Sequence, residues 1–330
     1  MDVAILFSVF VAGLALGIPV AITLGLSSLA YLLFAGMPPV VMPQKMYAGM
    51  DVFVLLSIPG FILAGNLMNQ GGITHRIIRF ANALVGWIRG GLGLTNISAS
   101  MLFGGITGTA VADAASLGGV LIPGMKKAGY PADFSAAVTA ASSTVGPIIP
   151  PSVPMIIVGA LSGISVGKMF LAGAIPGILM GVAMMVTCYI ISVRRGYPHQ
   201  PWQGWGEVAR SFGGAIWAIA MTFLIIYGLL SGYATPTETA VVASVYAFIV
   251  GAFIYRELPI RKVPGIVADS AVSAAGILAL VGFANVFGWI LVSERIPQAI
   301  ADSVLSLTDN KFLVILLINI LLLFVGMFME

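Results

Sequence analysis

Charged residues, cysteine and histidine are all scarce in this sequence. Asp, Glu, Lys and Arg make up 8% of the 330 residues, whereas 59% are hydrophobic. A soluble domain carries about 25% charged residues, so this shortage excludes an ordinary soluble fold. The basic residues are scattered singly or in pairs, which argues against a nucleic-acid partner. We therefore predict an all-α polytopic membrane protein in a lipid bilayer.

Motifs for catalysis and metal binding are also missing. Cys188 is the one cysteine, so an internal disulfide or a multi-cysteine metal centre is excluded. His75 and His199 fall in predicted cytoplasmic loops, so we expect no metal site there. The chain has no His-Glu-x-x-His pair, no Gly-x-Ser-x-Gly elbow and no cofactor motif. These absences favour a protein that is not an enzyme and needs no organic cofactor.

The most informative segment interrupts an apolar stretch at about residues 132–166. Four prolines and a glycine fall within nine positions, from Gly146 to Pro154. Each proline lacks an N–H group and clashes with the preceding turn, so a continuous helix is impossible. Lipid supplies no water to the freed backbone groups, so protein or a polar cavity must cover them. A broken membrane helix of this kind is typical of the substrate or ion site of a transporter.

A second unusual segment comes just before it. Residues 94–125 are apolar but hold a tract rich in glycine and threonine at 104–119. Cytoplasmic loops carry an excess of Lys and Arg, so the two possible topologies can be compared by charge. A re-entrant hairpin, with residues 3–34 as one outward crossing, places most basic residues inside: Arg76, Arg79, Arg89, Lys126, Lys127, Arg194, Arg195, Arg210, Arg256, Arg261 and Lys262. A straight span would place Lys126 and Lys127 outside and reverse every later loop.

The two halves of the chain show a weak internal similarity. Residues 16–19 (LGIP) precede one apolar helix as residues 234–236 (ATP) precede another, and Gly72-Ile73 matches Arg295-Ile296. Under the predicted topology the matched pieces run in opposite senses, as in the inverted repeats of secondary transporters. We predict a first repeat at 1–212, with a hairpin at about 94–125 and a broken helix at about 132–166. A second repeat at 213–330 is expected to be truncated in its second hairpin.

Several motifs, in order along the whole chain, carry a family resemblance. They are residues 103–113 (FGGITGTAVAD), 122–125 (IPGM), 142–152 (SSTVGPIIPPS), 167–173 (GKMFLAG), 175–177 (IPG) and 232–238 (GYATPTE). With these motifs the chain resembles the large membrane subunit of tripartite ATP-independent periplasmic (TRAP) transporters.

The resemblance implies a function and partners. The family imports organic anions, typically C4-dicarboxylates or sugar acids, by sodium-coupled transport across the bacterial inner membrane. A periplasmic binding protein delivers the anion, a small membrane subunit completes the complex, and a transport domain moves as an elevator. We expect the same of this chain, with sodium as the coupling ion.

The resemblance also implies a sodium site. Sodium is a hard cation, and unwound backbone carbonyls and half-helix C-termini supply oxygen ligands for it. By resemblance, the site falls on Gly146, Ile149 and Pro151 of the break, with Thr107 and Thr109 of the hairpin tip. The alternative is a proline-kinked helix whose hydroxyl groups cap their own backbone.

Nearby polar residues are candidates for further roles. The hydroxyl groups of Ser143, Thr144 and Ser152 are candidate substrate ligands beside half-helix N-termini, which attract anions. Asp113 could bind a cation, accept a proton, or cap the second arm of the hairpin. Glu238 follows a Thr-Pro pair and is interpreted as part of a helix start.

Other readings of the sequence remain open. Residues 74–87 are interpreted as an amphipathic helix at the inner membrane surface, and the family resemblance suggests that it braces the moving domain.

The alternatives for function are another ion-coupled secondary transporter of the same broad architecture, and, less favoured, a channel or an intramembrane enzyme. A channel needs no inverted pair of hairpins.

Overall fold

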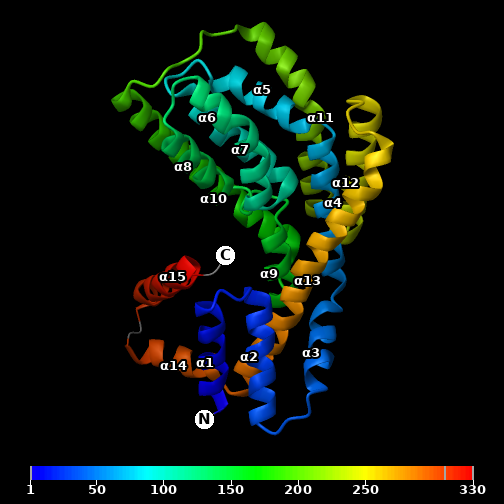
Figure 1. The fold of residues 1–330 in the computed structure, drawn as a ribbon, viewed down its shortest axis with the longest axis vertical. Coiled ribbons are helices and arrows are strands. Elements are labelled where there is room, and N and C mark those ends of the chain that lie inside the picture. Colours follow the sequence, from blue (N-terminus) through cyan, green and yellow to red (C-terminus); the bar gives the residue numbers. More distant parts are fainter. Residues whose placement is uncertain (1, 308–309, 329–330) are drawn as a thin grey trace. The chain divides into compact units, whose positions relative to one another are not determined.

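A computed structural model describes residues 2–307 and 310–328, and all regular structure among these residues is helical (Figure 1). The prediction of an all-α fold is confirmed. The α-helices are α1 (Asp2–Ala15), α2 (Val20–Phe34), α3 (Val41–Met50), α4 (Ser57–Gln70), α5 (Ile73–Val85), α6 (Gly91–Thr107), α7 (Ala110–Lys127), α8 (Ala132–Ser143), α9 (Val153–Ser162), α10 (Val166–Arg195), α11 (Trp205–Leu230), α12 (Pro236–Ile249), α13 (Val263–Ser293), α14 (Ile296–Leu307) and α15 (Lys311–Phe328).

Among the described residues, five helical segments are long and apolar enough to cross a membrane. They are Phe53–Gln70, Val166–Arg195, Trp205–Leu230, Pro236–Ile254 and Ile260–Ser293. A span needs about 20 predominantly apolar residues, which each of these segments approaches or exceeds. The prediction of a polytopic membrane protein is confirmed.

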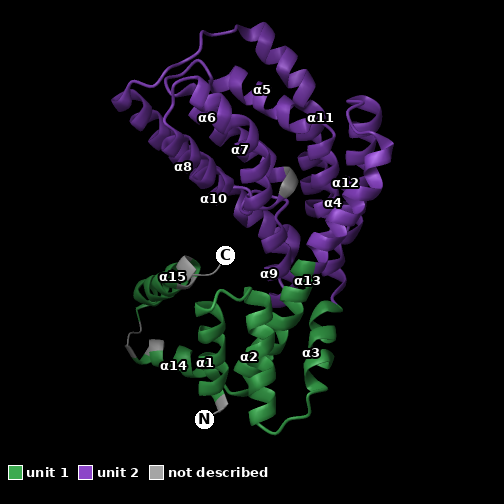
Figure 2. Ribbon diagram, viewed as in Figure 1, with its two compact units in different colours: residues 1–51, 276–330 green, residues 52–275 purple. Residues whose placement is uncertain are grey.

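The chain divides into two compact units (Figure 2). Unit 1 comprises residues 1–51 and 276–330, and unit 2 comprises residues 52–275. Each unit therefore contains residues from both predicted repeats. The backbone agrees at one matched pair, since Gly72 and Arg295 both have positive φ angles, of 84° and 56°, just before a helix begins. The inverted repeat itself stays a prediction.

In unit 1 the predicted single crossing at residues 3–34 is wrong. The run forms two helices, α1 and α2, that pack against each other (Figure 1). A Cβ atom at Gly13 would lie 2.6 Å from Thr23 Cγ2, so the missing side chain permits this close contact. The chain turns at Gly17, where φ is 73°, and Pro19 cannot continue the first helix. This run contains no Lys or Arg, so the predicted placement of the basic residues does not depend on it.

In unit 2 the amphipathic helix is present as α5. Its buried face includes Ile73, Ile77 and Phe80, and it packs against α6 and α11. On its other face Arg76 pairs with Glu257 at 2.7 Å, and Arg79 pairs with Glu207 at 2.7 Å. These ion pairs connect α5 to residues far along the chain within the same unit.

Candidate functional site

The predicted hairpin is formed by α6 and α7. Helix α6 ends at Thr107, and Gly108 has a φ angle of 63°, a conformation that glycine adopts without strain. The Gly108 N–H group donates to the Gly104 carbonyl at 3.1 Å, which closes the last turn. Thr109 is extended and precedes α7. The Thr107 side chain lies outside the part of the chain that the structure describes.

The predicted helix break is also present. Helix α8 ends at Ser143 and α9 begins at Val153, so Pro147, Pro150 and Pro151 all fall in the non-helical segment between them. The fourth proline lies in the first turn of α9, where its missing N–H group has no helical partner to lose. Ser152 caps α9, since its hydroxyl oxygen accepts a hydrogen bond from the Met155 N–H group at 3.3 Å.

The hairpin tip and the break lie directly against each other. A Cβ atom at Gly104 would lie 2.6 Å from Gly146 Cα, and one at Gly108 would lie 2.7 Å from the Pro151 carbonyl oxygen. Real carbon atoms do not come this close, so the backbones meet only because both tip residues are glycines. Two segments that the sequence marked separately therefore form one site.

Helix α11 reaches the same tip. The Thr222 hydroxyl donates to the Gly105 carbonyl at 3.0 Å, and a Cβ atom at Gly105 would lie 3.1 Å from the Pro150 carbonyl oxygen. Thr222 was not predicted from the sequence, because a threonine inside a long apolar helix carries no motif of its own.

Asp113 lies at this contact. Its side chain is fully buried in the first turn of α7. A Cβ atom added at Gly146 would lie 2.4 Å from Asp113 Oδ2, so the carboxyl group lies directly against this glycine. Thr109 occupies the N-cap position of α7, four residues before Asp113. The carboxyl group therefore faces the break, at the helix end whose dipole favours a negative charge.

Carbonyl groups throughout the break lack a hydrogen-bond donor among the described residues, including those of Thr144, Ile148 and Pro150. The oxygens of Gly146, Ile149 and Pro151 accept no hydrogen bond from any residue that the structure describes. The Thr109 hydroxyl likewise makes no hydrogen bond with the described residues and does not cap α7. Gly146 and Pro151 are buried and Ile149 is half-buried, so these oxygens are available to a bound ion or to water. They are oxygens of the residues that the family resemblance assigns to sodium.

The three candidate substrate ligands use their hydroxyl protons on nearby backbone. Ser143 donates to the Thr139 carbonyl at 2.7 Å, and Thr144 donates to the Ala141 carbonyl at 2.7 Å. The Ser152 hydroxyl donates to the Pro147 carbonyl. Ser143 and Ser152 are buried and Thr144 is exposed. Their role as substrate ligands stays a prediction.

A buried polar network behind the break was not expected from the sequence. The Asn96 amide donates to Thr139 Oγ1 at 2.6 Å, and the Ser100 hydroxyl donates to Ser142 Oγ at 3.0 Å. Ser142 in turn donates to Asn96 Oδ1 at 3.2 Å. Each of the four side chains is at most 3% exposed. The sequence feature that could have indicated this network is the spacing of Asn96 and Ser100, which lie one turn apart on one face of α6.

Comparisons with known proteins give the family. The model of the tripartite ATP-independent periplasmic transporter DctM component matches residues 7–330. The sialic acid TRAP transporter large permease of Vibrio cholerae is 43% identical over 95% of this chain and 74% of its own length. The C4-dicarboxylate TRAP transporter large permease of the same organism is 36% identical over 100% of this chain and 78% of its own length. The 2,3-diketo-L-gulonate TRAP transporter large permease of Escherichia coli is 37% identical, with the same coverages.

These relatives are permeases, so the chain is a transport protein and not an enzyme. With its long apolar helices it is a multi-pass protein of the bacterial inner membrane. The break, the glycine-lined hairpin tip and the match along nearly the whole chain agree, and the protein belongs to the DctM component family of tripartite ATP-independent periplasmic transporters.

Proposed function

We propose that the protein is the membrane subunit of a sodium-coupled importer of small organic anions. A periplasmic binding protein would deliver the anion, and a small membrane subunit would complete the complex. The relatives support this substrate class, since they are named for sialic acid, C4-dicarboxylates and 2,3-diketo-L-gulonate, which are all carboxylates. Sodium is the proposed coupling ion, and no other cofactor is involved.

The observation that carries the proposal is the set of unpaired oxygens at the break. The carbonyl groups of Gly146, Ile149 and Pro151 have no donor among the described residues, and two of these residues lie against the hairpin tip. Helices α6 and α8 both end at this contact, which brings the negative ends of their dipoles to it. The buried carboxyl group of Asp113 adds further oxygen atoms. Such a set attracts a cation and suits sodium.

The anion would use the opposite helix ends. Helix α7 begins at the tip without a side-chain cap, so its first N–H groups are available to a carboxylate. Helix α9 begins at the break and offers fewer, because Ser152 accepts from the Met155 N–H group and Pro154 has no N–H group. Lys and Arg are absent from the hairpin arms, residues 91–125, and from the broken helix, residues 132–166. Ser152 lies at the start of α9, whereas Ser143 and Thr144 lie at the C-terminal end of α8, and each hydroxyl oxygen keeps a lone pair.

The motion we propose is an elevator. The hairpin tip and the break both lie in unit 2, so one compact unit carries the whole candidate site. Transport would move that unit with its bound ion and anion, as in the family that the chain belongs to.

The test uses the full transporter with its partner subunits, and measures initial uptake against sodium concentration. Gly146→Val should raise the sodium requirement strongly, because a branched side chain restricts the backbone and displaces Asp113. Thr109→Ala removes one hydroxyl group and should have a milder effect of the same kind. The control is Gly119→Val in the second hairpin arm, where an added Cβ atom meets nothing within 4 Å.

Surface labelling establishes that each variant reaches the membrane in normal amounts. If Gly146→Val and Thr109→Ala both keep the parental sodium curve, the break is structural and the cation binds elsewhere.

A further inference from the structure

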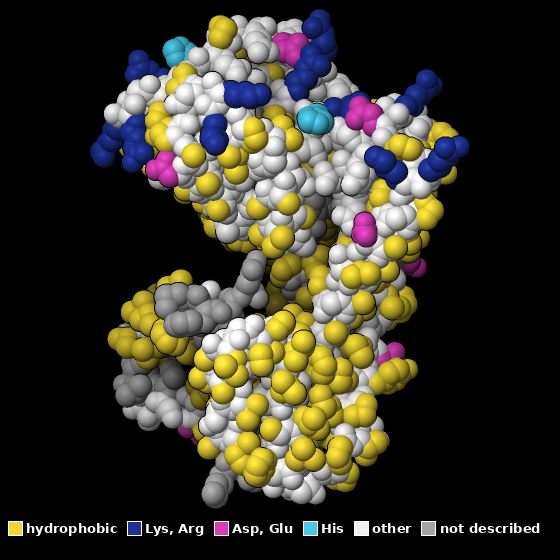
Figure 3. Space-filling view, viewed as in Figure 1, with side chains coloured by type: hydrophobic (Ala, Val, Ile, Leu, Met, Phe, Trp, Pro, Cys, Tyr) yellow, Lys and Arg dark blue, Asp and Glu magenta, His cyan; other side chains and the backbone are white. Residues whose placement is uncertain are grey.

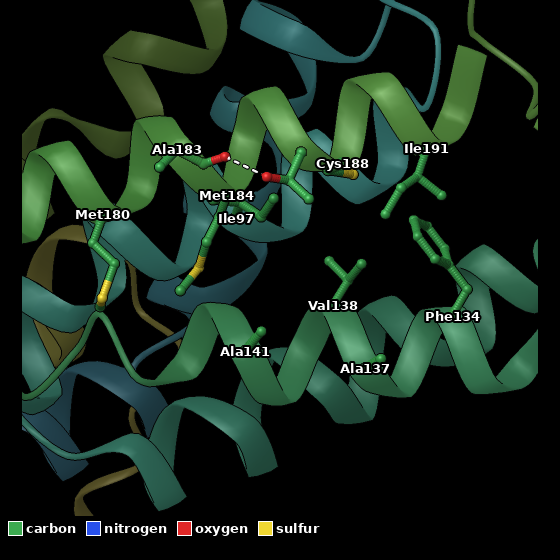
Figure 4. A pocket seen from close by; sticks show the side chains of 11 residues that line it. Ile97, Phe134, Ala137, Val138, Ala141, Met180, Ala183, Met184, Cys188 and Ile191 are labelled. Atoms are coloured by element: carbon green, nitrogen blue, oxygen red, sulfur yellow. Dashed lines mark hydrogen bonds between the residues drawn. The ribbon is translucent and has the colours of Figure 1, made fainter. Parts of the chain in front are cut away.

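An apolar groove runs between α8 and α10 in unit 2 (Figure 4). Its volume is about 360 Å³. Helix α10 lines it from Met180 to Ile191, and α8 lines it from Phe134 to Ala141. The groove is separate from the hairpin tip and the break, and the transport mechanism proposed above does not use it.

The wall of this groove offers no polar partner. Thr187 brings the one hydroxyl group among its lining residues, and that hydroxyl donates to the Ala183 carbonyl of the same helix at 2.9 Å (Figure 4). Cys188 lies in the wall and is 3% exposed. An occupant of the groove must therefore be a hydrocarbon, because a polar ligand would lose its hydrogen bonds to water.

The length of the groove matches one leaflet of a bilayer. From Met180 to Ile191 the helix rises about 16 Å, at about 1.5 Å per residue. Half of a hydrocarbon core is about 15 Å thick, whereas a transmembrane helix of a partner would need about 30 Å of contact. Helix α10 is itself long and apolar enough to span the membrane. The groove therefore fits an acyl chain better than it fits a partner helix.

One end of the groove carries positive charge. Arg194 and Arg195 lie three and four residues beyond Ile191, so they continue the face of α10 that lines the groove. Arg194 forms no ion pair with any residue that the structure describes. Asp133 at the start of α8 is the acidic group near Arg195. One acidic group beside two arginines leaves an excess of positive charge at this end of the groove.

The end of α7 adds two more basic residues, Lys126 and Lys127, to this region. Met125 of α7 and Tyr197 beyond α10 belong to one buried cluster, so the two helix ends lie together. In Figure 3, Lys and Arg side chains gather over this end of unit 2. The predicted topology places this end on the cytoplasmic side, where anionic lipids attract basic residues.

From this geometry we propose that the groove binds one acyl chain of an anionic phospholipid, whose phosphate lies against Arg194 and the neighbouring basic residues. The bound lipid would tie α8, which carries the break, to α10. The site is distinct from the sodium and substrate sites and does not depend on them.

The cysteine in the groove provides the assay. Cys188 is the one cysteine of the sequence and is nearly buried, so its slow labelling by N-ethylmaleimide in the purified protein reports how readily the groove opens at this position. After the lipid is stripped in detergent, phosphatidylglycerol should slow this labelling at lower concentrations than phosphatidylethanolamine with the same acyl chains. Arg194→Gln should raise the phosphatidylglycerol concentration for half-protection about fivefold, since one basic residue near a membrane surface contributes about 1 kcal/mol. Arg261→Gln removes the same charge far along the chain and should leave the curve unchanged.

A second variant tests the groove directly. Ala137→Trp places a large ring in the groove, whereas Ala136→Trp places it at the adjacent exposed position, which does not line the groove. Native mass spectrometry should find phosphatidylglycerol retained by the parent and by Ala136→Trp, and lost from Ala137→Trp.

Two results would overturn the proposal. One is equal protection by both lipids, with Arg194→Gln identical to the parent. The other is protection of Cys188 by the small membrane subunit and not by lipid, which would make the groove a protein interface. If Ala137→Trp does not fold, the exposed Arg194→Gln variant still decides the question.

Discussion

Replacing Gly104 with alanine should force the hairpin tip away from the helix break. A Cβ atom at this position would lie 2.6 Å from Gly146 Cα and 3.3 Å from Gly146 N. Carbon atoms prefer separations of about 3.5–4.0 Å, so the two backbones would have to separate by about 1 Å. Both obstructing atoms are backbone, so no side-chain rotation can relieve the contact.

The expected loss of stability follows from two opposing terms. Overpacking a closely packed interior costs about 1–3 kcal/mol. Alanine also stabilises a helix by about 1 kcal/mol relative to glycine, and Gly104 lies in α6, so this gain offsets part of that cost. We expect Gly104→Ala to lower the free energy of unfolding by up to about 2 kcal/mol. Gly119→Ala in α7 is the matched control, because an added Cβ atom there meets nothing within 4 Å and should stabilise the protein slightly.

Two measurements check this prediction. The first is the unfolding of the purified protein in detergent, compared between Gly104→Ala and Gly119→Ala. The second is uptake against sodium concentration in the assembled transporter, where separation of the tip from the break should raise the sodium requirement. If Gly104→Ala is as stable as Gly119→Ala and keeps the parental sodium curve, the close approach of tip and break does not matter for either property.

Two further predictions concern the surroundings of the site. Asn96→Ala should lower the free energy of unfolding by about 1–3 kcal/mol, because it removes the buried hydrogen bonds of Asn96 with Thr139 and Ser142. Ser98→Ala should cost much less, and equal stability of the two variants in detergent would contradict this. Burial raises the pKa of Tyr130 to about 12, so its contribution to stability is present below about pH 10, where the unfolded phenol ionises, and is lost as the pH rises to about 12. The difference in stability between the parent and Tyr130→Phe should therefore shrink between these pH values, and a constant difference would refute the assignment.

The sequence predicted the features that depend on local chemistry. The break between α8 and α9 follows from prolines that lack an N–H group, whatever surrounds them. The turn of the hairpin follows from Gly108, which adopts a positive φ angle without strain. The start of helix α12 after Thr235 was also predictable, and the capping box that Thr235 forms with Glu238 is present.

The first apolar run shows where such reasoning fails. Residues 3–34 are long enough for one span, but also for two short helices, and hydrophobicity does not distinguish them. Gly17 and Pro19 marked the turn, yet the pairing of α1 with α2 depends on the contact between Gly13 and Thr23. That contact forms only when the two helices pack together in the folded unit.

Tertiary structure also decided what the candidate site consists of. The glycines and prolines were visible in the sequence, but the approach of Gly104 to Gly146 joins residues 42 positions apart. The partners of Asn96 and the proximity of Asp113 to the break arise in the same way. Local chemistry determines which backbone groups are freed from a helix, because it acts within one turn. Whether another segment then pairs with those groups, or leaves their oxygens open to an ion, depends on packing between distant residues, which no local pattern records.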